Sequence, residues 1–337
     1  MDLAGKNIEQ YFIDLEEKGD FSCFPHGENY PAKYKTISND LYKWVHAEVD
    51  AGAMASESKE NTGIFLTHHG VNHIKTLIAK ASNLIQGQYI ELDSYELYLL
   101  LMSLHFHDVA NILGRKGHAF NSIIFIQKMG DGIVGQDRLT WEYVYEIANA
   151  HKGFVLEELP TEEHCHDIRF RPQLLASILK FADELSENFS RSSKINLDLG
   201  IVHEESILHH KFSSVVNSIF VKHETREVLM TFNLLEEDLK LKFKKGDQEV
   251  FLIDEIYLRT LKTYSEKVYC GRYMRPLINI DFIRVTIKIK LEDGSKPVIG
   301  YELKETFVEE TLEGLIKMTP DLKENSGQKW YDKLTKD

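Results

Sequence analysis

The sequence predicts an α-helical module followed by a smaller α+β domain with an antiparallel sheet. Apolar residues recur at helical spacing in several segments between residues 71 and 188. Near residue 192 the pattern changes to alternating and β-branched runs, which are typical of strands. The length of 337 residues agrees with about two domains, and 43% apolar residues are enough for a sizeable core.

The helical module begins with a weakly patterned helical stretch, and its first clear helix covers residues 71–85. Ile74, Leu77, Ile78 and Ala81 form one apolar face of that segment. Ser94 is a suitable N-cap for the next helix. By the same reasoning we expect helices over residues 94–113, 118–129, 139–151 and 171–188.

The second part reads as strands and two helices. Strands are expected over residues 194–202, 218–225, 226–235 and 282–291, with helices over 249–269 and 310–318. We therefore expect an N-terminal helical extension over residues 1–60, a helical domain over 61–192 and an α+β domain over 193–337.

Charge and composition exclude some functions. A net charge of −13 counts against a broad nucleic-acid surface, whereas a small phosphorylated substrate at a metal centre stays compatible with it. Three scattered cysteines, no signal peptide and no apolar run of about 18 residues favour a cytoplasmic protein without a membrane span.

Ionisable residues interrupt the apolar helices in a regular order. His69 and His73 are four residues apart, His107 and Asp108 are adjacent, and further along the chain come His118, His151 and Asp183. Such groups near apolar helix faces are costly unless they are paired or bind a metal. Imidazole nitrogens and carboxylate oxygens together suit one or two divalent ions, with Mn, Fe, Ni, Zn or Mg as candidates.

This order of residues resembles the HD superfamily of metal-dependent phosphohydrolases over about residues 60–190. The resemblance implies that His73, His107, Asp108 and Asp183 bind the first ion, and that His118 and His151 match the extra histidines of two-metal members. HHGVNH is also similar to a stretch of cyclic-nucleotide phosphodiesterases, which implies that His69 is a general acid. A homo-oligomer is expected from the same resemblance.

A second His-Asp pair, His166-Asp167, lies in a polar segment and is interpreted as a solvated loop. No GYP triplet accompanies the His107-Asp108 pair, so the cyclic-di-GMP subfamily is not indicated. Basic residues near the motif are candidates for phosphate contacts: Arg115, Lys116, Lys152 and Arg191.

The leading hypothesis is a phosphohydrolase that acts on a nucleotide or another small phosphorylated substrate through metal-activated water. Asp108 is a metal ligand essential for catalysis, and His69 or His118 assists the leaving group. Two alternatives stay open: a metal-dependent single-strand nuclease, and a nucleotide-sensing or protein-interaction module without turnover.

Overall fold

The computed structural model describes residues 5–54, 67–86, 91–113, 122–126, 138–153, 155–275, 277–304 and 311–335. The described residues form two compact units. The first unit holds those up to 54, 68–186 and 270–279, and the second holds 67, 187–269 and 280–335. The predicted boundaries at residues 60 and 192 stay a prediction.

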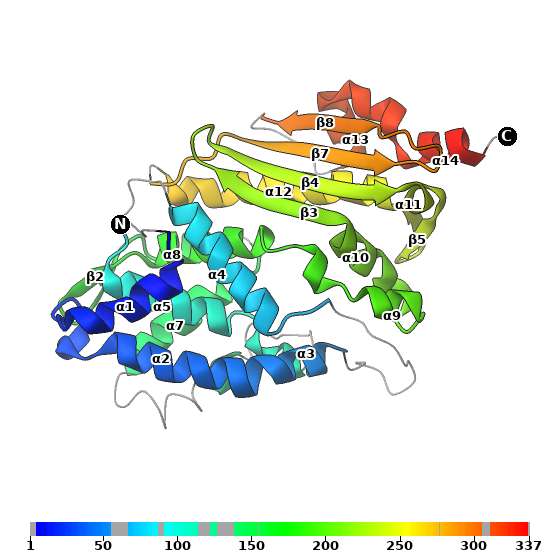
Figure 1. The fold of residues 1–337 in the computed structure, drawn as a ribbon. Helices are drawn as coiled ribbons and strands as arrows, with labels where there is room; N and C mark the ends of the chain where they lie inside the picture. The colour runs from blue at the N-terminus through cyan, green and yellow to red at the C-terminus, as the bar shows by residue number, and fades with distance from the viewer. Residues whose placement is uncertain are drawn as a thin grey trace. The chain divides into compact units, whose positions relative to one another are not determined.

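The first unit is helical (Figure 1). Its elements are α1 (Ile8–Lys18), η1 (Pro25–Gly27), α2 (Tyr30–Asp40), a π-helical turn (Leu41–Val45), α3 (His46–Met54), α4 (Val71–Ile85), α5 (Ser94–Phe106), η3 (Val109–Leu113), α7 (Arg138–Asn149), η5 (Leu156–Glu158) and α8 (Pro172–Glu184). Residues 122–126 are also helical. A short hairpin joins β1 (Glu163–Cys165) to β2 (Ile168–Phe170).

Helix α5 is the centre of this unit, because every residue from Tyr95 to Phe106 is buried. Asp93 and Glu96 form a capping box at its start. The Glu96 carboxylate also accepts two hydrogen bonds from the Arg171 guanidinium, at 2.8 and 2.7 Å. The first turn of α5 is therefore held to the start of α8; α5 leads directly into His107 and Asp108, and α8 carries Asp183.

The predicted continuous helix over residues 94–113 is wrong in one respect. Helix α5 ends at Phe106, His107 is its C-cap residue, and the chain resumes as a 3-10 helix from Val109. His107 and Asp108 thus lie in a turn between two helical segments. On an unbroken helix their side chains would diverge by about 100°.

The second unit contains a four-stranded sheet in the order β3-β4-β7-β8. Its strands are β3 (Val216–Lys222), β4 (Glu227–Leu235), β7 (Phe282–Lys290) and β8 (Val298–Leu303). The outer pairs are antiparallel, as expected, whereas the central pair β4–β7 is parallel. The parallel pair is possible because the chain returns through the long helix α12 (Leu252–Met274) before β7.

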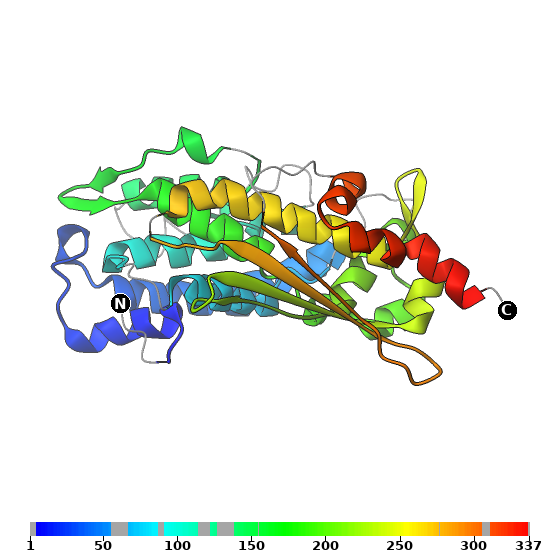
Figure 2. The same ribbon diagram turned by 90° about the horizontal axis from the view of Figure 1, so that it is seen from above.

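Helices cover one face of this sheet (Figures 1 and 2). Thr260 of α12 hydrogen-bonds the Tyr301 hydroxyl of β8 at 2.6 Å, and Phe212 of α10 packs on Phe232 of β4. The remaining elements are η6 (Phe189–Arg191), α9 (Lys194–Asp198), α10 (Glu204–Val215), α11 (Glu236–Lys240), β5 (Lys242–Lys245), β6 (Gln248–Phe251), α13 (Leu312–Met318), η7 (Pro320–Asn325) and α14 (Gly327–Thr335).

The strand predicted over residues 194–202 is wrong. Residues Lys194–Asp198 form the short helix α9, capped by Ser193 and followed by Gly200 in the left-handed region at φ 65°. The fold class itself, a helical module followed by an α+β domain, is confirmed. No helix among the described parts of the chain is long and apolar enough to cross a membrane.

Candidate metal centre

The start of α4 is fixed by a carboxylate from another helix. Asp50 of α3 accepts hydrogen bonds from the backbone N–H groups of His69 and Gly70, at 2.8 and 2.7 Å. Gly70 is the N-cap residue and has no side chain to cap the helix, so Asp50 supplies that cap in trans. His69 and His73 are positioned by this arrangement, because they lie on either side of the capped turn.

Gly70 is required by the close approach of α3. A Cβ atom at this position would lie 2.3 Å from Asp50 Oδ2 and 2.6 Å from the carbonyl oxygen of His46. Burial raises the pKa of the Asp50 carboxyl, but the hydrogen bonds from His68 and from the two backbone N–H groups outweigh it, and the net pKa is lowered. Asp50 was missed by sequence reasoning, because no local motif links residue 50 to residue 70.

Three histidines present the same ring nitrogen. The Nδ1 of His107 donates to the carbonyl oxygen of Leu104 at 2.9 Å, and the Nδ1 of His151 to that of Ala148 at 2.6 Å. The Nδ1 of His73 lies 3.5 Å from the Ser186 hydroxyl oxygen. A proton held on Nδ1 leaves the Nε2 lone pair available, as in histidines that bind metals.

These Nε2 atoms face carboxylates. His73 Nε2 lies 3.5 Å from Asp183 Oδ1, and His107 Nε2 lies 3.7 Å from the same oxygen. His107 Nε2 also lies 3.5 Å from Asp108 Oδ2. Ligand atoms of His73, His107 and Asp108 all lie within 4.8 Å of one another, and all three residues are buried.

The spacing of these atoms fits a divalent ion. Ligands about 2.1 Å from a common ion are separated by about 3.0 to 3.4 Å in octahedral or tetrahedral geometry. The separations of 3.5 to 3.7 Å need to contract by only a few tenths of an ångström. His107 Nε2 is buried and makes no hydrogen bond to any part of the chain that the structure describes. His73, His107 and Asp108 can therefore hold one divalent ion, and Asp183 Oδ1 lies within 3.7 Å of Nε2 in both histidines.

The charges of this cluster are strongly coupled. Burial lowers the pKa of His107, but Asp108 and Asp183 outweigh it and raise that pKa to about 9. Burial raises the pKa of the Asp183 carboxyl, yet the neighbouring His107 and His73 bring it well below its usual range. Without a metal, an imidazolium charge therefore balances the carboxylates. A divalent ion would replace that charge and release the proton.

The second oxygen of Asp108 faces a different histidine. Asp108 Oδ1 lies 3.7 Å from His151 Nε2, whereas Oδ2 faces His107 and also lies 3.9 Å from His69 Nε2. Burial lowers the pKa of His151 to about 4, so this ring is neutral at pH 7. Asp108 thus stands between the first group of ligands and the two histidines His69 and His151.

A buried polar chain supports α5 from behind. Glu9 accepts hydrogen bonds from the hydroxyls of Tyr34, at 2.7 Å, and Tyr42, at 3.1 Å. The Tyr34 oxygen lies 3.1 Å from His105 Nε2, and His105 Nδ1 lies 3.0 Å from His46 Nε2. Because a carboxylate only accepts, each donor in this chain points toward Glu9. Burial lowers the pKa of His46 to about 3 and that of His105 well below its usual value, so both imidazoles are neutral.

Sequence reasoning missed most of this chain. Of its members, only His105 is conspicuous in the sequence, because it interrupts an apolar segment two residues before His107. Lys180 was also missed. Its buried ammonium donates to the carbonyl oxygen of His151 at 2.9 Å, which fixes the backbone beside that ring.

The other predicted residues are not all brought to the cluster. His118, Arg115 and Lys116 lie outside the described residues. Lys152 directly follows His151 and is exposed. Arg191 belongs to the second unit, where it lies 3.4 Å from Glu187.

The second His-Asp pair, His166-Asp167, is an exposed turn between β1 and β2, as expected. The His166 ring packs against that of His26 with centroids 4.1 Å apart. Both residues have positive φ values, 55° and 56°.

Comparison with known proteins gives one match. The family model described as HD-CE matches residues 64–241. That segment includes His69, His73, the His107-Asp108 pair, His151 and Asp183. No curated protein and no solved structure matches the chain.

Proposed function

Because the chain belongs to the HD-CE family, an HD-type family, we propose that its helical unit is a metal-dependent phosphohydrolase acting on a nucleotide or another small phosphorylated substrate. The observation that carries this proposal is the convergence of His73 and His107, through Nε2, on the carboxylates of Asp108 and Asp183.

The proposal assigns separate tasks to these residues. A divalent ion held by His73, His107, Asp108 and Asp183 supplies Lewis acidity and lowers the pKa of water. Leu104 and Ser186 fix the ring orientations of His107 and His73 through their Nδ1 atoms. These contacts keep the Nε2 atoms aimed at the ion position without rearrangement.

His69 is the proposed proton donor to the leaving group. Its Nε2 lies 3.9 Å from Asp108 Oδ2, on the side of that carboxylate next to the ligand cluster. The trans cap by Asp50 holds the backbone of His69, so that the ring stays at the edge of the ligand cluster. His118, the other candidate for this role, stays a prediction.

His151 supports a second ion position. Its neutral ring, held by Ala148 and Lys180, faces the Asp108 oxygen that His107 does not use. Exposed Lys152 is the proposed phosphate contact beside it. The nucleotide class of the substrate comes from the resemblance in ligand order alone.

A matched pair of His-Asp dipeptides provides the test. The wild-type protein, Asp108→Asn and Asp167→Asn would be loaded with Mn²⁺ and screened against nucleoside mono-, di- and triphosphates and cyclic nucleotides. Hydrolysis in Asp108→Asn should fall at least about 100-fold, since a ligand to the ion loses its charge. Asp167→Asn changes the same dipeptide in an exposed turn and should hydrolyse like the wild type.

Other results would replace the proposal. Full hydrolysis by Asp108→Asn would exclude the mechanism. Tight binding of a nucleotide by the metal-loaded protein, with no product over hours, would favour a sensing module. Cleavage of single-stranded oligonucleotides, with every free nucleotide left intact, would favour the hypothesis of a single-strand nuclease.

A further inference from the structure

The sheet of the second unit has one open face. Along β7 buried residues such as Val285 and Ile287 alternate with Arg284, Thr286, Lys288 and Lys290. The buried set lies on the face covered by α10 and α12, and the alternate set lies on the opposite face. In Figures 1 and 2 no described helix of the second unit covers that opposite face, which looks toward the viewer in Figure 1.

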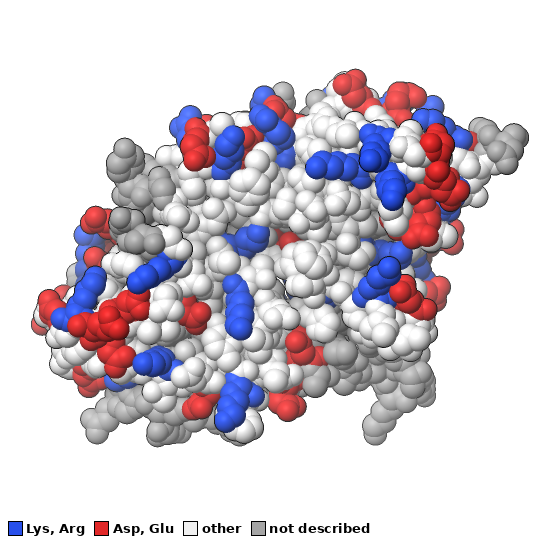
Figure 3. Space-filling view, in the orientation of Figure 1, with Lys and Arg blue, Asp and Glu red and all other residues white. Residues whose placement is uncertain are grey.

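The pairing register places cations in rows across this face. Lys288 lies opposite Asn233 of β4 and Val298 of β8, and Lys290 lies opposite Leu235. Lys222 lies at the other end of the face, on β3, where its backbone register partner is Glu227. In Figure 3 blue side chains lie over the strands, with red ones among them at the left and gathered beyond the strand ends at the right.

Three of these cations lack an acidic partner. Lys222, Lys288 and Lys290 are exposed and form no ion pair with any residue that the structure describes. Arg284, by contrast, bridges Glu227 and Glu302 at 3.2 and 3.0 Å. In a chain of net charge −13, these lysines, two at one end of the face and one at the other, leave positive charge on it.

The spacing of the cations along β7, and the hydroxyl groups between them, suit an extended polyanion. Arg284, Lys288 and Lys290 lie on one strand, where side chains on the same face recur about every 6.7 Å. That repeat is comparable to the distance between successive phosphates of an extended single strand. Thr231 and Thr286 lie side by side in the centre of the face and offer hydroxyl donors.

An exposed aromatic ring adds a place for a base. Phe220 of β3 is 42% exposed and lies opposite Leu229, which in turn lies opposite Arg284. A flat ring beside cations is the usual combination in surfaces that bind single strands without sequence preference. From Phe282 to Lys290, β7 extends over about 27 Å, which is enough for about four nucleotides.

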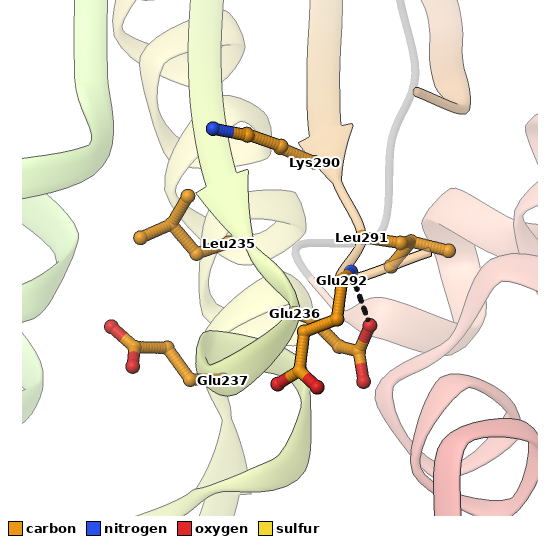
Figure 4. A pocket seen from close by; sticks show the side chains of 6 residues that line it. All are labelled: Leu235, Glu236, Glu237, Lys290, Leu291 and Glu292. Atoms are coloured by element: carbon orange, nitrogen blue, oxygen red, sulfur yellow. Dashed lines mark hydrogen bonds between the residues drawn. The ribbon is translucent and has the colours of Figure 1, made fainter. Parts of the chain in front are cut away.

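Acidic residues limit the surface at one end (Figure 4). At the end of β4 and β7 a shallow hollow is lined by Leu235, Lys290 and Leu291 together with the acidic Glu236, Glu237 and Glu292. Glu236 accepts a hydrogen bond from the backbone N–H of Glu292 at 2.8 Å. A phosphate chain would be repelled there, so its path is confined to the strands.

We propose that the open face of the β3-β4-β7-β8 sheet binds single-stranded nucleic acid through Lys222, Lys288, Lys290 and Phe220. Binding to this face depends on a few local cations. It does not require a broad basic surface, which the net charge of −13 counts against. A second copy of this chain fits it poorly, because a two-fold contact would bring the unpaired lysines against each other. An acidic protein would satisfy the lysines but would not need a flat exposed ring.

The test is oligonucleotide binding by the full chain in EDTA, so that hydrolysis plays no part and the outcome does not depend on the proposed function. Fluorescence anisotropy would follow a labelled dT₁₅ probe between 50 and 300 mM salt. With about three phosphate contacts, the logarithm of the affinity should fall with the logarithm of salt at a slope of about −2.

Variants of the face should separate charge from stacking. Lys288→Gln/Lys290→Gln should weaken binding at least about tenfold and reduce the slope to about −0.7. Phe220→Ser should weaken binding about tenfold with the slope unchanged. Lys323→Gln/Lys329→Gln removes two lysines from η7 and α14 and should bind like the wild type.

Three results would overturn the proposal. The first is no binding of dT₁₅ at 50 mM salt, or equal weakening of that binding by Lys288→Gln/Lys290→Gln and by the control Lys323→Gln/Lys329→Gln. The second is polyglutamate binding as tightly as dT₁₅, which would indicate an acidic protein partner. The third is a dimer in sedimentation that Lys288→Gln/Lys290→Gln dissociates while no oligonucleotide binds, which would make the face a contact between copies.

Discussion

The Asp50 carboxylate accepts a hydrogen bond from the Gly70 backbone N–H at 2.7 Å. Asp50 belongs to α3, so it caps a helix, α4, other than its own. His69 and His73, on either side of that turn, depend on the cap for their orientation. We expect Asp50→Ala to weaken binding of a divalent metal about 10- to 100-fold while the protein stays folded. Competition with a chelating dye would measure the change.

Asp14→Ala is the matched control for this variant. Asp14 is a surface carboxylate on α1 that pairs with Lys6 and Gln10, away from the ligands. Its removal should leave the metal affinity unchanged. Equal affinities in Asp50→Ala and the wild type would show that the cap has no part in organising the site.

Gly70→Ala should destabilise the helical unit. The added methyl would meet both the Asp50 carboxylate and the His46 carbonyl oxygen, so the two helices would have to move apart. We expect the free energy of unfolding in urea to fall by about 1–3 kcal/mol. Gly271→Ala is the control: nothing lies within 4 Å of the new Cβ in α12, and stability should rise by about 0.5–1 kcal/mol. A Gly70→Ala protein as stable as the wild type would contradict the tight contact.

Substitutions at His73 and at His151 should differ in their effect on the metal content of the protein. His73→Gln removes a ligand from the group around Asp183, so we expect less than about a tenth of the wild-type metal after gel filtration. His151→Gln affects only the other side of Asp108 and should retain at least one equivalent. Elemental analysis of both proteins would decide, and a full complement of metal in His73→Gln would refute the assignment of the first ion.

The stability of the protein should depend on pH through His46. Burial lowers the pKa of this residue to about 3, whereas in the unfolded chain it is near 6.5. Between these values the unfolded state binds one more proton, so the free energy of unfolding decreases as the pH falls below 6.5. The contribution is about 1.4 kcal/mol per pH unit.

His46→Gln provides the comparison, because an amide N–H can still donate to His105 Nδ1 but does not titrate. Urea unfolding of the two proteins in EDTA between pH 4.5 and 7 should give a shallower dependence for the variant. Parallel curves would show that His46 is protonated in the folded protein.

The residues of the candidate cluster stand out in the sequence, and the reason is physical. Charged groups at helical spacing within apolar segments are costly to bury, so His73, His107 and Asp183 stand out from their surroundings. The supporting residues do not stand out. Asp50 and Glu9 lie in weakly patterned polar helices, and their roles depend on tertiary contacts with Gly70 and Tyr34.

The errors in the predicted fold can be traced to particular residues and connections. Ile195, Leu197 and Leu199 alternate as in a strand, while Ile195 and Leu199 are also four residues apart, as on a helix. Ser193 and Gly200 provide the helix ends that resolve this ambiguity in favour of α9. The end of α5 at Phe106 has no proline or glycine to announce it, and the parallel pair β4–β7 depends on the path of α12.

The trans cap sets a minimum length for any fragment that is meant to keep the centre intact. A fragment starting at residue 64, where the family match begins, would retain His73, His107, Asp108 and Asp183. It would lack Asp50 and Glu9, so the first turn of α4 and the His105 ring would both lose their acceptors. The first fifty residues therefore supply contacts that support the cluster, and the boundary drawn by sequence similarity falls inside the helical unit.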